Sequence, residues 1–182
     1  MEDSNQHINS LLSRCLQGDS SAQMQIYKLY YKAMYNTALR ILKDEFEAED
    51  MMQEAFLIAF TKLDSFQGEV SFGAWLKRIV INKSLTQLKK NNRYNEVKME
   101  VVYEDQPDAE EAINYGKLNT SKVLEVLNSL KDNYRIVLTL HLREGFDYEE
   151  IAEILKYTNE NVRTTISRAK KKLKQLLVLE TA

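Results

Sequence analysis

The chain has 182 residues, 44% of them hydrophobic, and a formal net charge of -2, which suits one ordinary globular domain or two small ones. Its longest apolar runs are far shorter than the roughly 20 residues that span a bilayer. Its first residues also lack a signal-peptide pattern, so we expect a cytoplasmic protein without direct membrane insertion. Cys15 is the only cysteine and His7 and His141 are the only histidines, which excludes an intramolecular disulfide and a metal cage of soft ligands.

Helical spacing of apolar residues predicts four helices in the amino-terminal half. In chain order they cover about Ile8 to Leu16, Ala22 to Leu42, Glu47 onward, and Phe72 to Asn92. Gly18 is placed to end the first helix, and Asp19 or Ser20 can cap the second. Cys15 lies on the apolar stripe of the first helix, so we expect a buried thiol. No segment shows a convincing strand pattern, and the four helices should form a bundle.

The third predicted helix has one apolar and one polar face. Its apolar residues recur at i, i+3 and i+4 and should pack inward: Met52, Ala55, Phe56, Ala59, Phe60 and Leu63. Asp50, Gln53 and Glu54 lie off that stripe and should face outward. These three residues are therefore candidates for contact with a partner.

The loop after this helix and the start of the fourth helix combine large aromatic residues with cations. The residues are Phe66, Phe72, Trp75, Lys77, Arg78, Asn82 and Lys83. Exposed aromatic rings beside cations suit single-stranded DNA, because unstacked bases can lie on the rings while the cations hold the backbone. Alternatively, the aromatic residues belong to the bundle core. For Phe72 the core interpretation is the stronger one, and for Trp75 both remain open.

The segment from Asn95 to Gly116 contains the only proline, Pro107, many carboxylates and little helical periodicity. Unstructured connections beyond about 12 to 15 residues are uncommon inside compact domains, so we interpret residues 95–116 as an acidic flexible linker. The prediction is an all-α fold with two small helical domains. The first, residues 1–94, is the helical bundle, and the second, residues 117–182, is a helix-turn-helix domain.

Two helices, Ser121 to Leu130 and Asn133 to Arg143, are predicted to lead the second domain. Asp147 and Glu150 then have the spacing of a capping box, so the next helix should begin at Tyr148. A polar turn follows at residues 156–159, where Thr158 or Asn159 can cap the last helix. This order of a short capped helix, a tight turn and a second helix predicts a helix-turn-helix.

The last helix also divides into two faces. Val162, Ile166, Ala169, Leu173 and Leu176 have the spacing of an inward face. The outward residues include donors that can bind base edges and phosphate oxygens in the major groove: Asn161, Arg163, Thr164, Ser167, Arg168 and Lys171. The alternative is a solvated basic surface helix. The preceding turn, and the absence of any acid between Arg163 and Lys174, favour a recognition helix.

Charge is segregated along the chain. Acidic blocks at 44–54 and 96–111 alternate with basic blocks at 77–93 and in the last helix. This pattern predicts two nucleic-acid contacts on one chain, with the acidic surfaces available for another partner.

The segment EAEDMMQEAFLIAFTKLDSFQGEVSFGAWLKRIVINKSLTQLKK resembles region two of bacterial sigma factors of the sigma-70 superfamily, and Leu127 to Leu177 resembles region four. A linker in place of a middle domain is typical of the short extracytoplasmic-function (ECF) type. The chain departs from the family pattern at Lys131, where proline is frequent, and at Lys156, where glycine is frequent. A positive φ at Lys156 would cost about 1 kcal/mol.

The resemblance implies a subunit that binds RNA polymerase core and directs it to promoter DNA. Asp50, Gln53 and Glu54 match the face that docks on the polymerase. The residues that match minus-ten recognition and melting are Phe66, Gln67, Gly68, Trp75, Lys77, Arg78, Asn82 and Lys83. The residues proposed for minus-thirty-five recognition are Asn161, Arg163, Thr164, Ser167, Arg168 and Lys171. A cognate anti-sigma factor is a further expected partner.

The sequence fits three other classes of protein less well. A conventional repressor or activator would need a ligand-binding or phospho-acceptor domain where this chain has a helical bundle. An enzyme is disfavoured because the sequence has no Gly-rich phosphate loop, Cys-His pairing or metal-ligand spacing, so we expect no catalytic residues, metal or cofactor. An adaptor would have no use for the cations between Arg163 and Lys174.

Overall fold

The computed structural model describes residues 2–91 and 119–181, and all regular structure within these ranges is helical. The chain divides into two compact units, Met1–Glu96 and Val97–Ala182. The predicted all-α class with two helical domains is confirmed. The predicted linker, residues 95–116, lies outside the described residues. No helix in the described ranges is long and apolar enough to cross a membrane.

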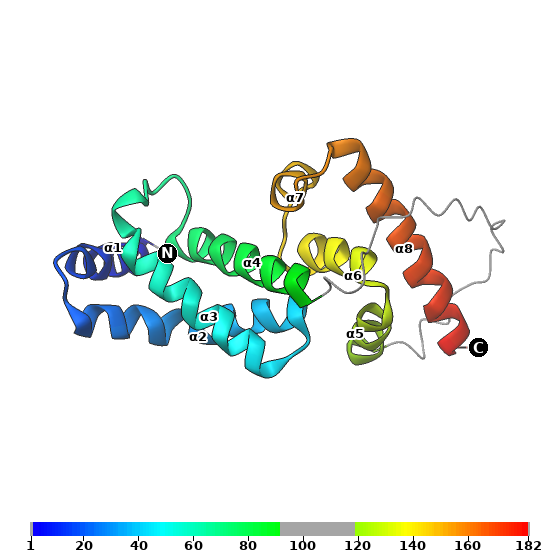
Figure 1. The fold of residues 1–182 in the computed structure, drawn as a ribbon, viewed down its shortest axis with the longest axis horizontal. Coiled ribbons are helices and arrows are strands. Elements are labelled where there is room, and N and C mark those ends of the chain that lie inside the picture. Colours follow the sequence, from blue (N-terminus) through cyan, green and yellow to red (C-terminus); the bar gives the residue numbers. More distant parts are fainter. Residues whose placement is uncertain (1, 92–118, 182) are drawn as a thin grey trace. The chain divides into compact units, whose positions relative to one another are not determined.

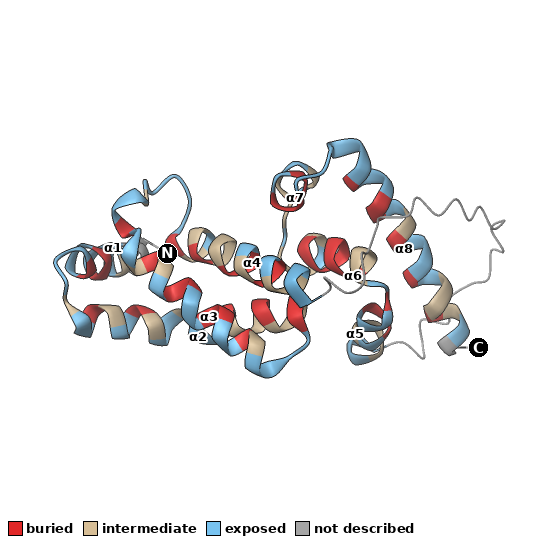
Figure 2. Cartoon of the chain, in the orientation of Figure 1, coloured by how far each residue is buried: buried red, intermediate tan, exposed pale blue. Residues whose placement is uncertain are grey.

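The first unit consists of α-helices joined by short connections (Figure 1). They are α1 (Glu2–Leu16), α2 (Ser20–Leu42), α3 (Glu45–Thr61) and α4 (Phe72–Asn91), with a 3₁₀ turn, η1 (Leu63–Ser65), before the last loop. Helices α2, α3 and α4 pack against one another, and α1 packs on α2. Figure 2 shows the buried positions of these helices on the sides that face each other. This packing follows from the apolar stripes in the sequence.

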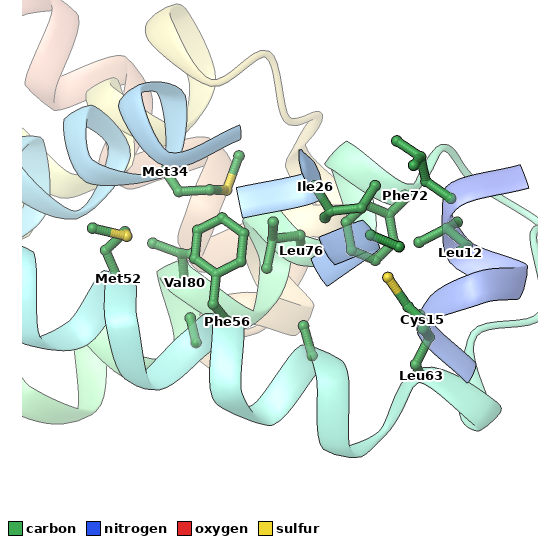
Figure 3. Packing of buried hydrophobic residues seen from close by; sticks show 14 of the residues in the cluster. Leu12, Cys15, Ile26, Met34, Met52, Phe56, Leu63, Phe72, Leu76 and Val80 are labelled. Atoms are coloured by element: carbon green, nitrogen blue, oxygen red, sulfur yellow. The ribbon is translucent and has the colours of Figure 1, made fainter. Parts of the chain in front are cut away.

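Side chains from all four helices form the core of this unit (Figure 3). Phe56 of α3 is 2% exposed and Phe72 of α4 is 3% exposed, so the core interpretation of Phe72 is confirmed. Cys15 is buried as expected, and its burial raises the pKa of the thiol. The thiol is therefore protonated at neutral pH.

Short polar side chains set the helix starts in the first unit. Asp19, not Ser20, caps α2, because its Oδ1 accepts hydrogen bonds from the backbone N–H groups of Ser21 (2.8 Å) and Ala22 (3.1 Å). The side chain of Arg14 donates to Asp19 and lowers the pKa of its carboxyl. Asp44 caps α3 through the N–H of Glu47. A capping residue lies three positions before the amide that it binds and directly before the helix. Helix α3 therefore begins at Glu45, two residues before the predicted start near Glu47.

The second unit contains α5 (Thr120–Ser129), α6 (Asp132–Leu138), a π-helical turn η4 (Thr139–Arg143), α7 (Tyr148–Leu155) and α8 (Asn159–Thr181). Helices α5, α6 and α7 all pack against α8. The single helix predicted from Asn133 to Arg143 is therefore α-helical only as far as Leu138. Arg135 is 1% exposed, and its guanidinium donates to Asp132 Oδ1 at 2.7 Å, which pairs the buried charge.

Candidate nucleic-acid interface

Helix α7 begins at Tyr148, as the sequence predicts. Asp147 Oδ1 accepts a hydrogen bond from Glu150 N at 2.8 Å, and Glu150 Oε2 accepts one from Asp147 N at 2.9 Å. These reciprocal bonds are the capping box expected from the spacing of the two acids. They fix the first turn of α7, and with it the entry to the helix-turn-helix.

The turn between α7 and α8 uses a left-handed backbone conformation. Lys156 has φ 59° and ψ 46°, and the N–H of Tyr157 donates to Ala152 O at 3.0 Å. Of the two predicted caps for α8, Thr158 acts, because its Oγ1 accepts from Asn161 N at 3.2 Å. The turn is thus complete although a lysine occupies the position where glycine is favoured.

Replacing Lys156 with glycine is expected to stabilise the second unit by about 0.5–1 kcal/mol. Relief of left-handed strain is worth about 1–2 kcal/mol, and the greater freedom of glycine in the unfolded chain offsets about 0.4–1 kcal/mol. Urea unfolding followed by circular dichroism measures the change. Lys156→Ala is the matched control, because it removes the same charge and keeps the strained Cβ. Equal stabilities of the two variants would contradict the strain argument.

Figure 2 shows α8 with exposed and buried positions along its length, and the residues predicted to contact DNA are mostly among the exposed ones. Five of them are exposed: Asn161, Arg163, Thr164, Ser167 and Lys171. Arg168 is half-buried. On this side of α8 the unit therefore presents hydrogen-bond donors of the types that contact base edges and phosphate oxygens.

The inward face of α8 differs from the prediction at its end. Val162, Ile166, Ala169 and Leu173 are buried as expected, but the next buried residue is Leu177, and Leu176 is half-buried. At about 100° per residue the two leucines lie at similar angles on either side of the stripe, so helical spacing did not distinguish them. Thr165, which the apolar pattern did not include, is buried as well.

The polar face of α3 is where the sequence predicts it. Asp50, Gln53 and Glu54 are all exposed. Glu54 forms an ion pair with Lys83 of α4, with 2.5 Å between Glu54 Oε2 and Lys83 Nζ. The structure thus brings together one residue predicted for polymerase docking and one predicted for DNA.

The aromatic residues near the start of α4 form a cluster. The ring centroids of Phe66 and Trp75 are 5.3 Å apart, and those of Phe72 and Trp75 are 5.7 Å apart. Phe66 and Trp75 are half-buried and pack against the core, so neither of the two interpretations that the sequence left open for Trp75 is excluded. Each ring combines a packed part with an accessible part.

The remaining residues predicted for this site lie in the loop before α4 and along α4 itself. Gln67, Gly68 and Asn82 are exposed, whereas Lys77, Arg78 and Lys83 are half-buried. Gly68 has φ +75°, a conformation that favours glycine. The loop therefore holds its backbone in a shape that a side chain at position 68 would strain.

Comparison with protein families identifies both units. Residues 26–94 match the model of Sigma-70 region 2, and residues 120–173 match the model of Sigma-70, region 4. The chain belongs to the sigma-70 family. The predicted resemblance is confirmed, and each matched segment lies within one of the two compact units.

Several relatives of this sigma factor are named as ECF sigma factors. It is 29% identical to the ECF RNA polymerase sigma factor SigW of Bacillus subtilis, with 93% of this chain and 96% of the relative covered. It is 31% identical to the RNA polymerase sigma factor YlaC of the same organism, over 82% of this chain and 88% of the relative. The identity to the ECF RNA polymerase sigma-E factor of Escherichia coli is 29%, with 88% of both proteins covered.

Two solved structures resemble the sigma factor over most of its length. One is the sigma factor RpoE in complex with the anti-sigma factor NepR from Bartonella quintana, with a TM-score of 0.58 and 28% identity, covering 85% of this chain and 95% of that one. The other is CnrH in complex with the cytosolic domain of CnrY, with a TM-score of 0.55 and 25% identity, covering 92% and 94%.

Sequence reasoning missed two apolar residues on the outward face of α3 in the sigma factor. Phe46 is 83% exposed and Leu57 is 67% exposed. With Asp50 and Gln53 they follow the spacing i, i+4, i+7 and i+11, which places all four on one helical stripe. The helical spacing of Phe46 and Leu57 can be found in the sequence, but the more numerous inward apolar residues dominate the periodicity of this helix.

Proposed function

We propose that this sigma factor uses its two units for different parts of promoter-specific transcription initiation. It binds RNA polymerase core, reads the minus-thirty-five element as duplex with α8, and holds the opened minus-ten strand with the loop before α4 and with α4 itself. The observation that carries this proposal is the succession of a region 2 match and a region 4 match, each on a unit with the corresponding polar surface.

For the minus-thirty-five element we propose Asn161, Arg163, Thr164, Ser167, Arg168 and Lys171 as the contacting residues. Their support is the exposed donor-rich face of α8 and the short turn that precedes it. Guanidinium and hydroxyl groups read base edges and phosphates in the major groove. The inward face of the same helix is packed, so the donors are presented on a rigid element.

For the minus-ten element we propose Phe66, Gln67, Gly68, Trp75, Lys77, Arg78, Asn82 and Lys83. Partial exposure of the Phe66 and Trp75 rings leaves aromatic surface on which a base can stack. The nearby cations can hold the phosphates of the separated strand. Base capture requires a strand that is already unpaired, so this surface acts on opened DNA.

For polymerase docking we propose Asp50, Gln53 and Glu54 on α3. All three are exposed, and none is needed for the core of the bundle. The helix carries acids and no cation from Asp44 to Thr61, which favours a basic partner surface.

Binding energy is sufficient for this function, and we propose that the chain has no catalytic centre of its own. Opening DNA costs about 1.4 kcal/mol per base-pair step in lost stacking, and each base stacked on an aromatic ring returns about 1–3 kcal/mol. Acidic surfaces oppose DNA, so we expect the isolated chain to bind promoters weakly. The polymerase then sets the separation of the two DNA-binding surfaces.

We further propose a region 2 domain at residues 1–94, a linker at residues 95–116 and a region 4 domain at residues 117–182. We also propose that the protein acts in the cytoplasm. One structural relative, the sigma factor RpoE, is bound to the anti-sigma factor NepR. By analogy we propose that a cognate anti-sigma factor holds this chain until a signal releases it.

Run-off transcription tests the proposal. Purified chain is added to polymerase core on a library of promoter templates, and initiation is expected only when both are present. Arg163→Ala should weaken promoter use by about 1–3 kcal/mol, or about 5- to 150-fold. Lys28→Ala removes an exposed cation of α2 and should leave promoter use unchanged. No initiation on any template above that of core alone would refute the proposed function.

A further inference from the structure

Arg163 lies against an aromatic ring from the preceding helix. Its guanidinium carbon is 5.7 Å from the centroid of the Tyr148 ring, within the range of a cation–π contact. Arg163 is exposed and Tyr148 is half-buried. The guanidinium is therefore held on one side while it remains accessible to a partner.

Tyr148 is itself held from two directions. The capping box formed by Asp147 and Glu150 fixes its backbone at the first position of α7. The ring of His141 lies 5.1 Å from the Tyr148 ring, and His141 Nδ1 forms a hydrogen bond with Phe146 O at 3.1 Å. His141 belongs to the π-helical turn η4, so the residue that packs on the Tyr148 ring comes from a regular element of the fold.

A supported ring of this kind has an energetic consequence for the arginine. An arginine that reads a base edge loses rotamer freedom when it binds, and less is lost when the free protein already restricts it. The planar guanidinium also stacks on an aromatic face, which an aliphatic neighbour cannot offer. The contact therefore favours a narrow set of Arg163 orientations before DNA arrives.

We propose that Tyr148 is a positioning residue that orients Arg163 for base recognition, with His141 supporting its ring. This inference rests on the proposed role of Arg163 as a major-groove reader. Tyr148 acts through the arginine and needs no DNA contact of its own. The competing explanation is that Tyr148 only packs the domain, in which case its loss weakens binding at all base pairs alike.

The test measures base preference position by position. Holoenzyme assembled from polymerase core and each full-length variant selects templates from a promoter library in which the minus-thirty-five element is randomised. The variants are Arg163→Ala, Tyr148→Leu, Tyr148→Phe and the double variant Tyr148→Leu/Arg163→Ala. Tyr157→Leu is the matched control, because it makes the same change in an exposed tyrosine of the turn.

Arg163→Ala is expected to relax base preference at the position that it reads. Tyr148→Leu should relax the same position by about two- to fivefold, the range of an exposed cation–π contact, and leave the other positions unchanged. Tyr148→Phe keeps the ring and should retain wild-type preference, as should Tyr157→Leu. In the Arg163→Ala background Tyr148→Leu should have no further effect, since the contact is already lost.

An even loss at all positions, or relaxation at a position that Arg163→Ala does not affect, would overturn the inference. If Tyr148→Leu folds poorly, His141→Leu serves in its place, because it removes the side chain that packs on the Tyr148 ring. His141→Leu must then relax base preference at the position that Arg163→Ala affects. If it does not, the inference is refuted. An unchanged profile for Arg163→Ala would overturn the inference while initiation by the holoenzyme leaves the proposed function intact. Failure of the wild-type chain to support initiation would overturn both.

Discussion

Phe56→Ala is expected to lower the free energy of unfolding of the first unit by about 3–5 kcal/mol, the range for removal of a fully buried aromatic side chain. Phe56 is 2% exposed, and its ring lies 4.8 Å from the ring of Tyr27. Figure 3 shows it among Met34, Leu76 and Val80, residues of α2 and α4. Alanine would therefore leave a cavity at the junction of three helices.

Urea unfolding followed by tryptophan fluorescence measures this effect, because Trp75 is the only tryptophan of the chain and packs against the same core. Leu57→Ala is the matched control, one residue further along α3. Leu57 is 67% exposed, so its loss should change stability by less than about 0.5 kcal/mol. If Phe56→Ala and Leu57→Ala lowered the free energy of unfolding by similar amounts, the assignment of Phe56 to the core and Leu57 to the surface would be contradicted.

Trp75→Leu is expected to reduce open-complex formation by about 5- to 150-fold, which corresponds to about 1–3 kcal/mol for the loss of one base–ring stack. Trp75 is half-buried, so any substitution also disturbs its packing against Phe66 and Phe72. Trp75→Phe is the informative partner. It also removes volume, but it keeps an aromatic face for a base.

Permanganate reactivity of the minus-ten region measures opening, and a footprint over the minus-thirty-five region measures upstream binding. We expect Trp75→Leu to lose opening and keep the upstream footprint, whereas Trp75→Phe keeps most of both. Equal defects in the two variants would assign Trp75 to the core alone. That outcome would remove Trp75 from the proposed minus-ten site and leave the Phe66 ring and the cations of α4 as its remaining support.

Features that depend on neighbouring residues were predictable without coordinates. Asp147 and Glu150 form the expected capping box, because both partners of each hydrogen bond lie three residues apart. The outward direction of Asp50 and Gln53 follows from the helical period and from the apolar stripe on the other side. The positive φ at Lys156 was considered only because the resemblance to sigma factors implies a frequent glycine at that position, and not from the neighbouring residues.

Features that depend on contacts between helices were not predictable in the same way. The spacing of apolar residues did not separate Leu176 from Leu177, because the choice depends on what α8 packs against. An aromatic side chain is equally suited to a protein core and to a DNA-binding surface, so the residue types of Phe66 and Trp75 did not predict their exposure. The packing of neighbouring residues makes both side chains half-buried.

Local sequence was thus enough for the approximate positions of the helices, for the capping box of α7 and for the outward direction of Asp50 and Gln53, because i to i+4 interactions determine these. The folded chain alone established the ion pair between Lys83 and Glu54 and the contact between Arg163 and Tyr148. Each of these joins side chains from two helices across the packing between them. The approach of two helices depends on the shape of the whole core, which no short stretch of sequence encodes.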